Sequence, residues 1–235
     1  MTESGWLRAT SVAGGLWYLC NAPVNAHRRK AGRRKLRLFL CACCRCVWDL
    51  MPRGPYRKAV QLGERMCEEE DVAKELAALG IDPWPHLSME VALHLRHAAG
   101  AALLSVQTEL AHAANAGSEA AAWAAGWWKH HAEDIKVVHK TADAERLAQV
   151  ALLHDIFGNP FRPAKKAVPQ RCRNDRTVQS MARTIYFKKR FADLPILADA
   201  LEDAGCDNAR MLAHCRGPVP HVRGCWVIDL LLGKE

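Results

Sequence analysis

Long hydrophobic runs and strand patterns are both missing from this 235-residue sequence. No stretch approaches the roughly 18 uninterrupted apolar residues that a membrane-spanning helix needs, so we expect no such helix and no membrane partner. Alternating β-branched runs of useful length are absent, as are the dipeptides Asn-Gly and Asp-Gly that favour tight hairpins. The apolar stretch 11–24 follows Glu3 and Arg8 and not a basic region, which is not typical of a secretory signal. A cytoplasmic location is therefore expected.

Helix-forming patterns, in contrast, cover most of the chain. Residues 34–51 place Leu, Phe, Val and Cys on one broad face at helical spacing, and Pro52 ends that segment. The segments 88–115 and 118–140 are rich in Ala and other strong helix formers and are separated by Gly117. We therefore predict an all-α fold of about nine to ten helices, with a long Ala- and Trp-rich helical hairpin in the middle.

One long irregular segment divides the predicted helices. Residues 158–174 contain three prolines and five Lys or Arg, and long loops in compact domains tend to be functional. We predict a helical N-terminal region at 1–157, a basic proline-containing loop at 158–174 and a helical C-terminal region at 175–235. The C-terminal region is expected to pack on the helix at 35–50 as one unit, because neither apolar face can be buried alone.

The ten cysteines are interpreted as small apolar residues. Four of them crowd one predicted helix: Cys41, Cys43, Cys44 and Cys46. A chain of this length can bury a core without disulfides, so reduced thiols in a helical core are favoured. Trp123 and Trp127 are four residues apart, which favours core packing over a base-stacking platform.

Some polar residues at helix positions have plain structural interpretations. Asp175 and Asp207 each precede a predicted helix, and we expect each to be its N-cap. His154 and Asp155 could be drawn as an acid and base pair, but adjacent helical residues point about 100° apart. A pair of surface residues is therefore favoured.

The stretch 213–226, AHCRGPVPHVRGCW, gathers side chains that can bind metals or act as nucleophiles. A Cys-dependent phosphatase is excluded, because His221 stands where that motif requires Arg, and Pro218 and Pro220 remove N–H groups from a phosphate cradle. A zinc site is the open alternative, with four candidate ligands: Cys206, Cys215, His221 and Cys225. Their spacing matches no standard finger, so we favour a joint between two helices, with His221 near the start of the last helix. No catalytic residue and no cofactor is expected.

Charge is unevenly distributed along the chain. Residues 1–67 hold 13 Lys and Arg against 3 acids and residues 162–190 hold 10 against 1, whereas residues 68–161 hold 6 against 14. The first basic block can equally be a solvated helix start that pairs with the acidic middle. If the blocks contact phosphates, the candidate residues are Arg28, Arg29, Lys30, Arg33, Arg34, Lys35, Lys165, Lys166, Arg171 and Arg173.

Two classes of function remain open. The favoured one is a non-enzymatic helical module for protein interaction or scaffolding, and the alternative is a basic nucleic-acid-binding protein. The alternative is weaker, because the presumed recognition helix at 207–216 is short and carries only Arg210 and Arg216 as base-reading donors. A zinc-stabilised helical domain comes third.

Three segments carry a resemblance to a known family. These are KLRLFLCACCRCVW at 35–48, a segment at 144–163 that contains ALLHDIFGNPFRP, and 194–235, which begins LPILADALEDAGC. They resemble an expanded family of uncharacterised planctomycete proteins, over roughly 75 residues. The sequence departs from the family where KKAVPQRCRNDRTV replaces an acidic, Trp-containing stretch before TV. The resemblance implies the helical architecture and no enzyme chemistry.

Overall fold

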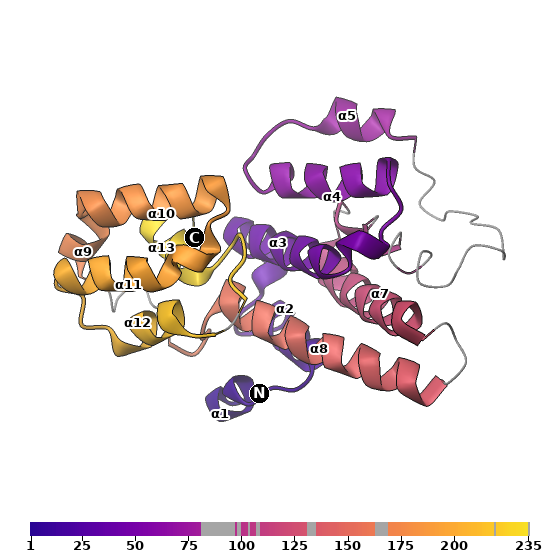
Figure 1. The fold of residues 1–235 in the computed structure, drawn as a ribbon, viewed down its shortest axis with the longest axis horizontal. Coiled ribbons are helices and arrows are strands. Elements are labelled where there is room, and N and C mark those ends of the chain that lie inside the picture. Colours follow the sequence, from indigo (N-terminus) through magenta and orange to yellow (C-terminus); the bar gives the residue numbers. More distant parts are fainter. Residues whose placement is uncertain are drawn as a thin grey trace. The chain divides into compact units, whose positions relative to one another are not determined.

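The structure, a computed structural model, describes residues 1–80, 97, 100–102, 104–106, 109–130, 135–162, 169–218 and 220–234. Helices, turns and irregular segments make up these residues, and no strand occurs among them (Figure 1). Nine of the described α-helices have seven residues or more, which confirms the predicted all-α fold. None of the described helices is long and apolar enough to cross a membrane.

The chain divides into two compact units, one formed by residues 8–150 and the other by residues 1–7 together with 151–235. The division falls within α8 (Ile135–Phe157), so this helix contributes residues to both units. The sequence analysis placed the boundaries elsewhere, at the two ends of the irregular segment 158–174. The packing of the helix at 35–50 on the C-terminal region stays a prediction.

The unit at 8–150 contains the cysteine-rich helix of the sequence analysis, α3 (Lys30–Cys46). The other α-helices of this unit whose bounds the structure describes are α2 (Val12–Cys20), α4 (Pro55–Met66), α5 (Ala73–Ala78), α7 (Leu110–His130) and the first part of α8. Cys41, Cys43 and Cys44 are buried free thiols of α3, as predicted. Cys46 is exposed, so the core prediction was wrong for this residue. Two positions along a helix turn a side chain by about 200°, away from the face that Cys44 shares with the core.

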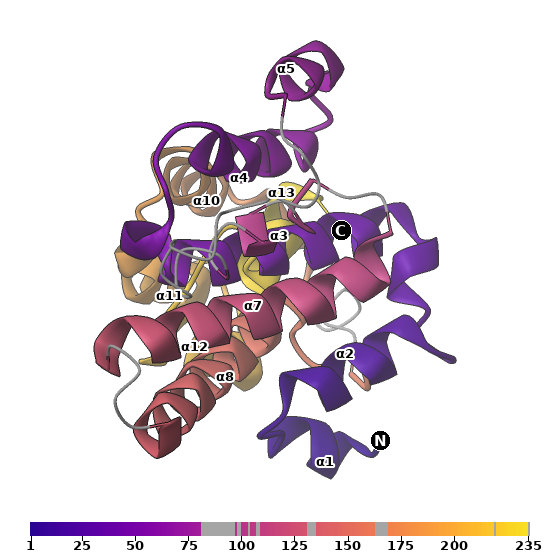
Figure 2. The ribbon, with the colours of Figure 1, turned by 90° about the vertical axis from the view of Figure 1, so that its right-hand side faces the viewer.

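A helical hairpin is formed by α7 and α8, which lie side by side (Figures 1 and 2). Its helices have other bounds than the predicted 88–115 and 118–140, and residues 88–96 of the predicted first helix lie outside the described residues. The predicted break at Gly117 is wrong, because α7 runs through this residue without interruption. Gly117 instead allows a close approach of α3, since a Cβ there would lie 2.2 Å from Leu40 Cδ1. Gly126 does the same for α8, since its Cβ would lie 2.7 Å from the Val138 carbonyl oxygen. Both glycines are needed for close packing and not for a turn.

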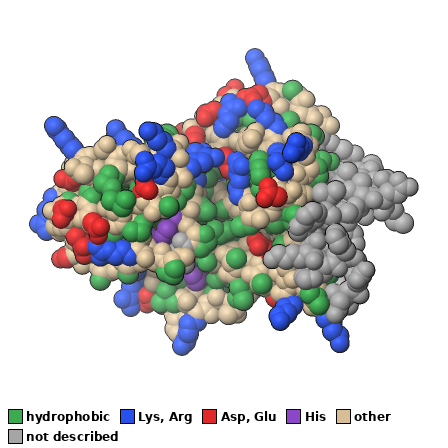
Figure 3. Space-filling view, in the orientation of Figure 1, with side chains coloured by type: hydrophobic (Ala, Val, Ile, Leu, Met, Phe, Trp, Pro, Cys, Tyr) green, Lys and Arg blue, Asp and Glu red, His purple; other side chains and the backbone are tan. Residues whose placement is uncertain are grey.

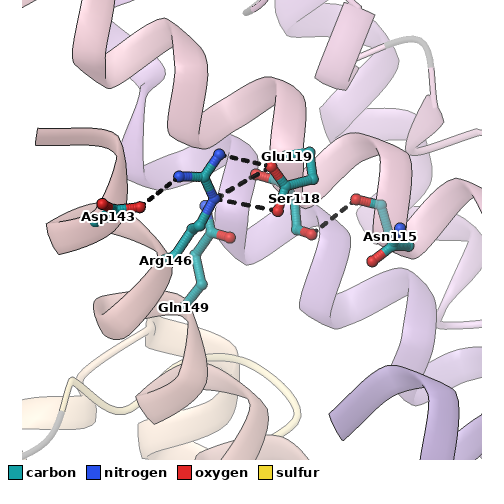
Figure 4. A network of polar contacts seen from close by, with 6 residues as sticks. All are labelled: Asn115, Ser118, Glu119, Asp143, Arg146 and Gln149. Carbon is teal, nitrogen blue, oxygen red and sulfur yellow. Dashed lines mark hydrogen bonds and ion pairs between the residues drawn. The ribbon is translucent and has the colours of Figure 1, made fainter. Parts of the chain in front are cut away.

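Polar contacts join the two helices of this hairpin (Figure 4). Arg146 of α8 donates to the Glu119 carboxylate of α7 at 2.8 Å and to Asp143 of its own helix at 2.7 Å. The Gln149 side chain donates to the carbonyl oxygen of Ser118 at 3.2 Å. Charged side chains on facing positions of α7 and α8 therefore reinforce the contact that the small residues allow.

Trp123 packs within the hairpin, as the four-residue spacing predicted. Its ring is half-buried and meets His139 of α8 edge-on at 5.0 Å between ring centroids. The Arg146 guanidinium lies over the same ring at 5.3 Å. Trp123 therefore has partners inside the fold, and a base-stacking role for it is not favoured. The side chain of Trp127 lies outside the described residues.

The unit formed by 1–7 and 151–235 holds the five C-terminal helices and α1 (Glu3–Leu7). The C-terminal helices are α9 (Gln170–Asn174), α10 (Arg176–Lys188), α11 (Leu194–Asp203), α12 (Ala209–Arg216) and α13 (Trp226–Leu232). Their apolar faces share one core, which includes Val178, Ile185, Tyr186, Leu197, Leu201, Met211, Val227 and Ile228. Trp6 of α1 is buried as well, and its indole N–H donates to the Gly158 carbonyl oxygen at 3.0 Å.

Two helix starts in this unit test the predicted N-caps. Asp175 caps α10, because its side chain accepts a hydrogen bond from Val178 N at 3.0 Å, as predicted. The cap of α12 is Asn208, which accepts from Met211 N at 3.1 Å, and not Asp207. Asn208 is the residue directly before the first helical position, and an N-cap must stand there to reach the free N–H groups of the first turn. The predicted irregular segment also contains a short helix, α9.

Candidate metal centre

Four side chains from separate parts of the C-terminal unit converge on one point. Asp155 lies near the end of α8, and His214 lies in the last turn of α12. The chain then leaves the helix at Gly217 and forms a loop that carries His221. Cys225 occupies the N-cap position of α13. The helix–loop–helix joint predicted at 213–226 is present, and it brings His221 and Cys225 close to Asp155.

The geometry of this cluster is set by one carboxylate. His221 Nδ1 lies 2.6 Å from Asp155 Oδ1, and His214 Nε2 lies 3.1 Å from the same oxygen. His214 Nε2 also lies 3.4 Å from the sulfur of Cys225. The second carboxylate oxygen, Asp155 Oδ2, accepts a hydrogen bond from Val222 N at 3.0 Å. One potential ligand atom from each of the four side chains lies within 4.8 Å of the other three.

The cluster is almost completely removed from water. The Asp155 side chain has no exposed surface, and those of His221 and His214 are 6% and 14% exposed. Burial alone would raise the pKa of the Asp155 carboxyl, but the hydrogen bonds from His214 and His221 outweigh burial, so the pKa is lowered. Burial raises the pKa of the Cys225 thiol well above its usual value, and the nearby Asp155 raises it further. The cluster therefore combines an ionised carboxylate with a neutral thiol.

Only half of the predicted zinc ligands belong to this cluster. His221 and Cys225 do, but Cys206 and Cys215 are not part of the group. Both are buried in the helical core, which is the structural role that the sequence analysis favoured for the cysteines. Cys215 lies next to His214 in α12, and adjacent helical residues point about 100° apart, so both cannot face the same centre.

Sequence reasoning missed Asp155 and His214, which replace the two cysteines. Asp155 was predicted to belong to a surface pair, and this is wrong because the carboxylate is buried. Its neighbour His154 faces another way, with its ring 5.0 Å from that of Trp6. Spacing along the sequence did not indicate that Asp155 is a ligand, because it lies on a different helix about sixty residues before the other candidate ligands. A signal was present in the apolar residues around it, since Leu152, Leu153 and Ile156 are all buried.

The position of His221 also differs from its prediction. It was expected near the start of the last helix, but α13 begins at Trp226 and the residue at the N-cap is Cys225. His221 lies in the preceding loop, and its ring packs edge-on against His214 at 4.8 Å between centroids. Its other ring nitrogen, Nε2, is buried and has no hydrogen-bond partner among the described residues. The hydrogen bonds of this ring are therefore confined to Asp155.

A catalytic Cys–His–Asp triad does not fit these contacts. In such a triad the two nitrogens of the histidine serve different partners, one the nucleophile and the other the carboxylate. Here the same atom, His214 Nε2, faces both Cys225 and Asp155. A nucleophilic thiol is also accessible and has a lowered pKa, whereas Cys225 is fully buried and its pKa is raised.

A tetrahedral metal site does fit them. Zinc bonds of about 2.0–2.3 Å to nitrogen, oxygen and sulfur place the ligand atoms of a tetrahedron about 3.3–3.8 Å apart. The contacts of 3.1 Å and 3.4 Å made by His214 Nε2 are close to this range. The shortest contact, 2.6 Å between His221 and Asp155, is a hydrogen bond that would lengthen when a metal replaces the proton. All four ligand atoms lie within 4.8 Å of one another, so Asp155, His214, His221 and Cys225 would hold one ion once the wider separations close to the tetrahedral range.

The predicted phosphate-binding residues of the first basic block are largely engaged within the fold. Lys30 forms an ion pair with Glu69 at 2.7 Å, and Arg34 donates to the Cys67 carbonyl oxygen at 3.1 Å. Arg33 donates to the Arg28 carbonyl oxygen at 3.2 Å. This arrangement matches the alternative interpretation, a helix start that pairs with the acidic residues following α4. Arg28, Arg29, Lys30 and Arg33 keep exposed surface, whereas Arg34 and Lys35 are half-buried.

The predicted residues of the second basic block are also held by nearby groups where they are described. Arg171 donates to the Gly205 carbonyl oxygen at 3.1 Å, and Arg173 donates to the Gln170 side chain at 2.6 Å. Lys165 and Lys166 lie outside the described residues.

No protein-family model matches the chain, and comparison with curated proteins and with solved structures finds no match. The resemblance to planctomycete proteins stays a prediction.

Proposed function

We propose that the protein is a helical module that acts by binding and not by catalysis, and that its C-terminal unit is stabilised by a Zn²⁺ ion. Asp155, His214, His221 and Cys225 are the proposed ligands. The observation that carries the proposal is the convergence of four ligand atoms to within 4.8 Å, although Asp155 and Cys225 are 70 residues apart in sequence. This inference replaces the expectation that no cofactor is bound.

The donor set favours zinc over other divalent ions. Two imidazole nitrogens, one thiolate sulfur and one carboxylate oxygen are all ligands that Zn²⁺ accepts in four-coordinate sites. Magnesium and calcium prefer sites made of oxygen alone, which this cluster does not offer. Ligation by Asp155 and Cys225 as anions would also bring a net charge of zero to the site, and a neutral site is the one that a buried position tolerates best.

The proposed ion would have a structural role. It would join the end of α8 to the end of α12 and the start of α13, across the loop that follows Gly217 and precedes Cys225. Four protein ligands fill a tetrahedral shell, so no open position would remain for a substrate or a reactive water. The burial of all four side chains supports the same conclusion, because a substrate could not reach them.

The proposal is tested by metal analysis of protein purified without a metal-affinity tag. We expect about one zinc per chain by inductively coupled plasma mass spectrometry. A chelator should lower the Tm of the parent protein. The Cys225→Ser variant should contain no zinc, and a chelator should leave its Tm unchanged. Cys215→Ser is the matched control, because Cys215 is equally buried in the same core and lies outside the cluster. This variant should keep the zinc.

Two outcomes would contradict the proposal. One is a protein free of zinc whose Tm is unchanged both by added Zn²⁺ and by a chelator. The other is equal loss of zinc from the Cys215→Ser and Cys225→Ser variants, because it would show that binding does not depend on the proposed ligand set.

A further inference from the structure

One face of α10 is exposed along its whole length and carries an unusual set of side chains. Arg176, Ser180, Arg183 and Phe187 are all exposed, and they are spaced by four, three and four residues. That spacing places them in a single line on the helix surface. The opposite face carries Val178, Ala182, Ile185 and Tyr186 and is buried in the core of the unit. The helix is therefore fixed in the fold and presents this line to solvent.

The surface around this line is strongly basic. Residues 176–192 contain five Lys or Arg and no Asp or Glu, and Lys188, Lys189 and Arg190 follow Phe187 directly and are exposed. Figure 3 shows Lys and Arg side chains gathered over the C-terminal part of α10. Among these cations, Arg190 forms an ion pair with Asp193 at 2.6 Å. The surface therefore attracts anions.

Two further cations approach the same end of α10 from other elements. The Arg223 guanidinium lies 5.2 Å from the centroid of the Tyr186 ring, and Lys234 Nζ lies 4.8 Å from it. The Tyr186 ring also meets Phe187 edge-on, with 5.3 Å between the centroids and 85° between the planes. These contacts extend the positive charge around Phe187 beyond α10 itself.

The exposed aromatic ring of Phe187 distinguishes this surface from a face that is merely basic. Its side chain is 65% exposed, although a helix face in water usually carries polar residues. Its edge-on contact with the buried Tyr186 gives the ring a neighbour on one edge and leaves much of its surface uncovered. An exposed aromatic ring among cations offers a stacking surface for a flat group whose attached chain is negatively charged.

We propose that this face of α10 binds single-stranded nucleic acid. A base would stack on Phe187, and the phosphates on either side would contact Arg183 and Lys188. The occupant is single-stranded because only an unpaired base can present its flat face to a side chain. An acidic peptide would satisfy the cations but would make no particular use of the exposed ring. The proposal uses none of the ten residues that the sequence analysis selected, and it does not depend on the metal site.

The test is fluorescence anisotropy with labelled oligonucleotides and the purified full chain. The probes are a 15-nucleotide poly(U), a 15-nucleotide poly(dT) and a duplex of equal length, at low salt. The parent protein should bind both single strands more tightly than the duplex. Phe187→Ala should weaken single-strand binding at least about fivefold, whereas Phe187→Trp should restore it, because stacking on an aromatic side chain is worth that much or more.

The salt dependence separates phosphate contacts from stacking. Arg183→Ser should reduce the log–log salt slope by about 0.7, the value for one phosphate contact on a single strand. Phe187→Ala should leave the slope unchanged. The matched control is Leu147→Ala, which removes an equally isolated exposed apolar side chain on α8 and should leave binding unchanged. All variants should have the far-ultraviolet circular dichroism and the metal content of the parent protein.

Three results would overturn the proposal. The first is no binding of any oligonucleotide at low salt. The second is binding that falls with Arg28→Ser and Arg29→Ser but not with Phe187→Ala, because it would assign the contact to the first basic block. The third is a poly-Glu peptide that binds as tightly as the single strands and displaces them, with equal affinity for the Phe187→Ala variant, because it would show a general anion surface.

Discussion

Asp155 Oδ1 and His221 Nδ1 are 2.6 Å apart, in a pair that joins the end of one helix to a loop 66 residues further along the chain. Both side chains are buried, and this contact accounts for the hydrogen bonding of the His221 ring within the described residues. Removal of the carboxylate would therefore release the loop as well as the cluster. The pair is the centre of the predictions about the C-terminal unit.

Asp155→Asn should destabilise the C-terminal unit strongly. The amide keeps the shape of the side chain but loses its charge, and a hydrogen bond to a charged group contributes about 1.5–3 kcal/mol. The measurement is urea unfolding of the metal-free protein, followed by circular dichroism. Asp199→Asn is the control, since Asp199 forms an exposed ion pair with Arg216 and such pairs contribute about 0–1 kcal/mol. Equal losses for the two variants would contradict the structure.

The same carboxylate should give the metal-free protein an acid-sensitive stability. The pKa of Asp155 is lowered in the folded state, so the folded protein binds fewer protons than the unfolded chain at this group. Its contribution is therefore fully present above the unfolded pKa of about 3.9 and is lost as the pH falls through the folded pKa. Asp155→Asn should flatten the pH dependence of the free energy of unfolding below about pH 5. An unchanged acid limb would show that the contact does not form.

Trp226→Ala should cost far more stability than the loss of an exposed tryptophan. The Trp226 side chain is only 5% exposed and packs in the core of the C-terminal unit, with its ring 5.1 Å from that of His214. Truncation of a buried aromatic residue costs about 3–5 kcal/mol. Trp17→Ala is the matched control, because Trp17 is 65% exposed, and its loss should cost under about 0.5 kcal/mol. Chemical unfolding of both variants measures the difference.

Gly117→Ala should destabilise the unit at 8–150, although alanine favours a helix more than glycine does. The new Cβ would lie 2.2 Å from Leu40 Cδ1, and such overpacking costs about 1–3 kcal/mol. Leu40→Ala in the same protein should relieve the clash, so the two changes together should cost less than the sum of the single losses. Gly100→Ala has open space around its Cβ and should be neutral or slightly stabilising. A stabilising Gly117→Ala would disprove the close contact.

The thiols should react in an order that their environments set. Cys20 is half-buried and should be alkylated first in the native protein. Cys46 as a whole residue has exposed surface. Its sulfur is nevertheless withdrawn from water and lies near Glu145, and both effects raise the pKa of the thiol to about 12. Cys46 should therefore react more slowly than Cys20. Cys215 should stay unmodified until the protein unfolds, because burial raises its pKa to about 12 and removes it from solvent. Mass spectrometry after timed alkylation at pH 8 reads each site, and early modification of Cys215 would contradict its burial.

The sequence by itself determined the helical character of the chain. Strong helix formers, apolar residues at helical spacing and the absence of strand patterns act over a few neighbouring residues, so they are visible without the fold. For the same local reason the sequence predicted the cap at Asp175, the buried cysteines of α3 and the joint at 213–226.

The tertiary structure alone decided what each local signal was for. Glycine is a residue type that often ends a helix, so the sequence indicated a break at Gly117. Only the close contact between Gly117 and the Leu40 side chain in the folded structure shows that this glycine is needed for packing. His221 and Cys225 were visible as ligand types, but their partners were the wrong cysteines, because Asp155 reaches the cluster through the packing of α8 and not through spacing along the chain. The proposed binding surface of Phe187 and Arg183 also depends on the tertiary structure, because the exposure of a side chain is a property of the folded protein. Spacing records which residues share a helix face, whereas the packing of distant helices decides which faces meet and which remain in water.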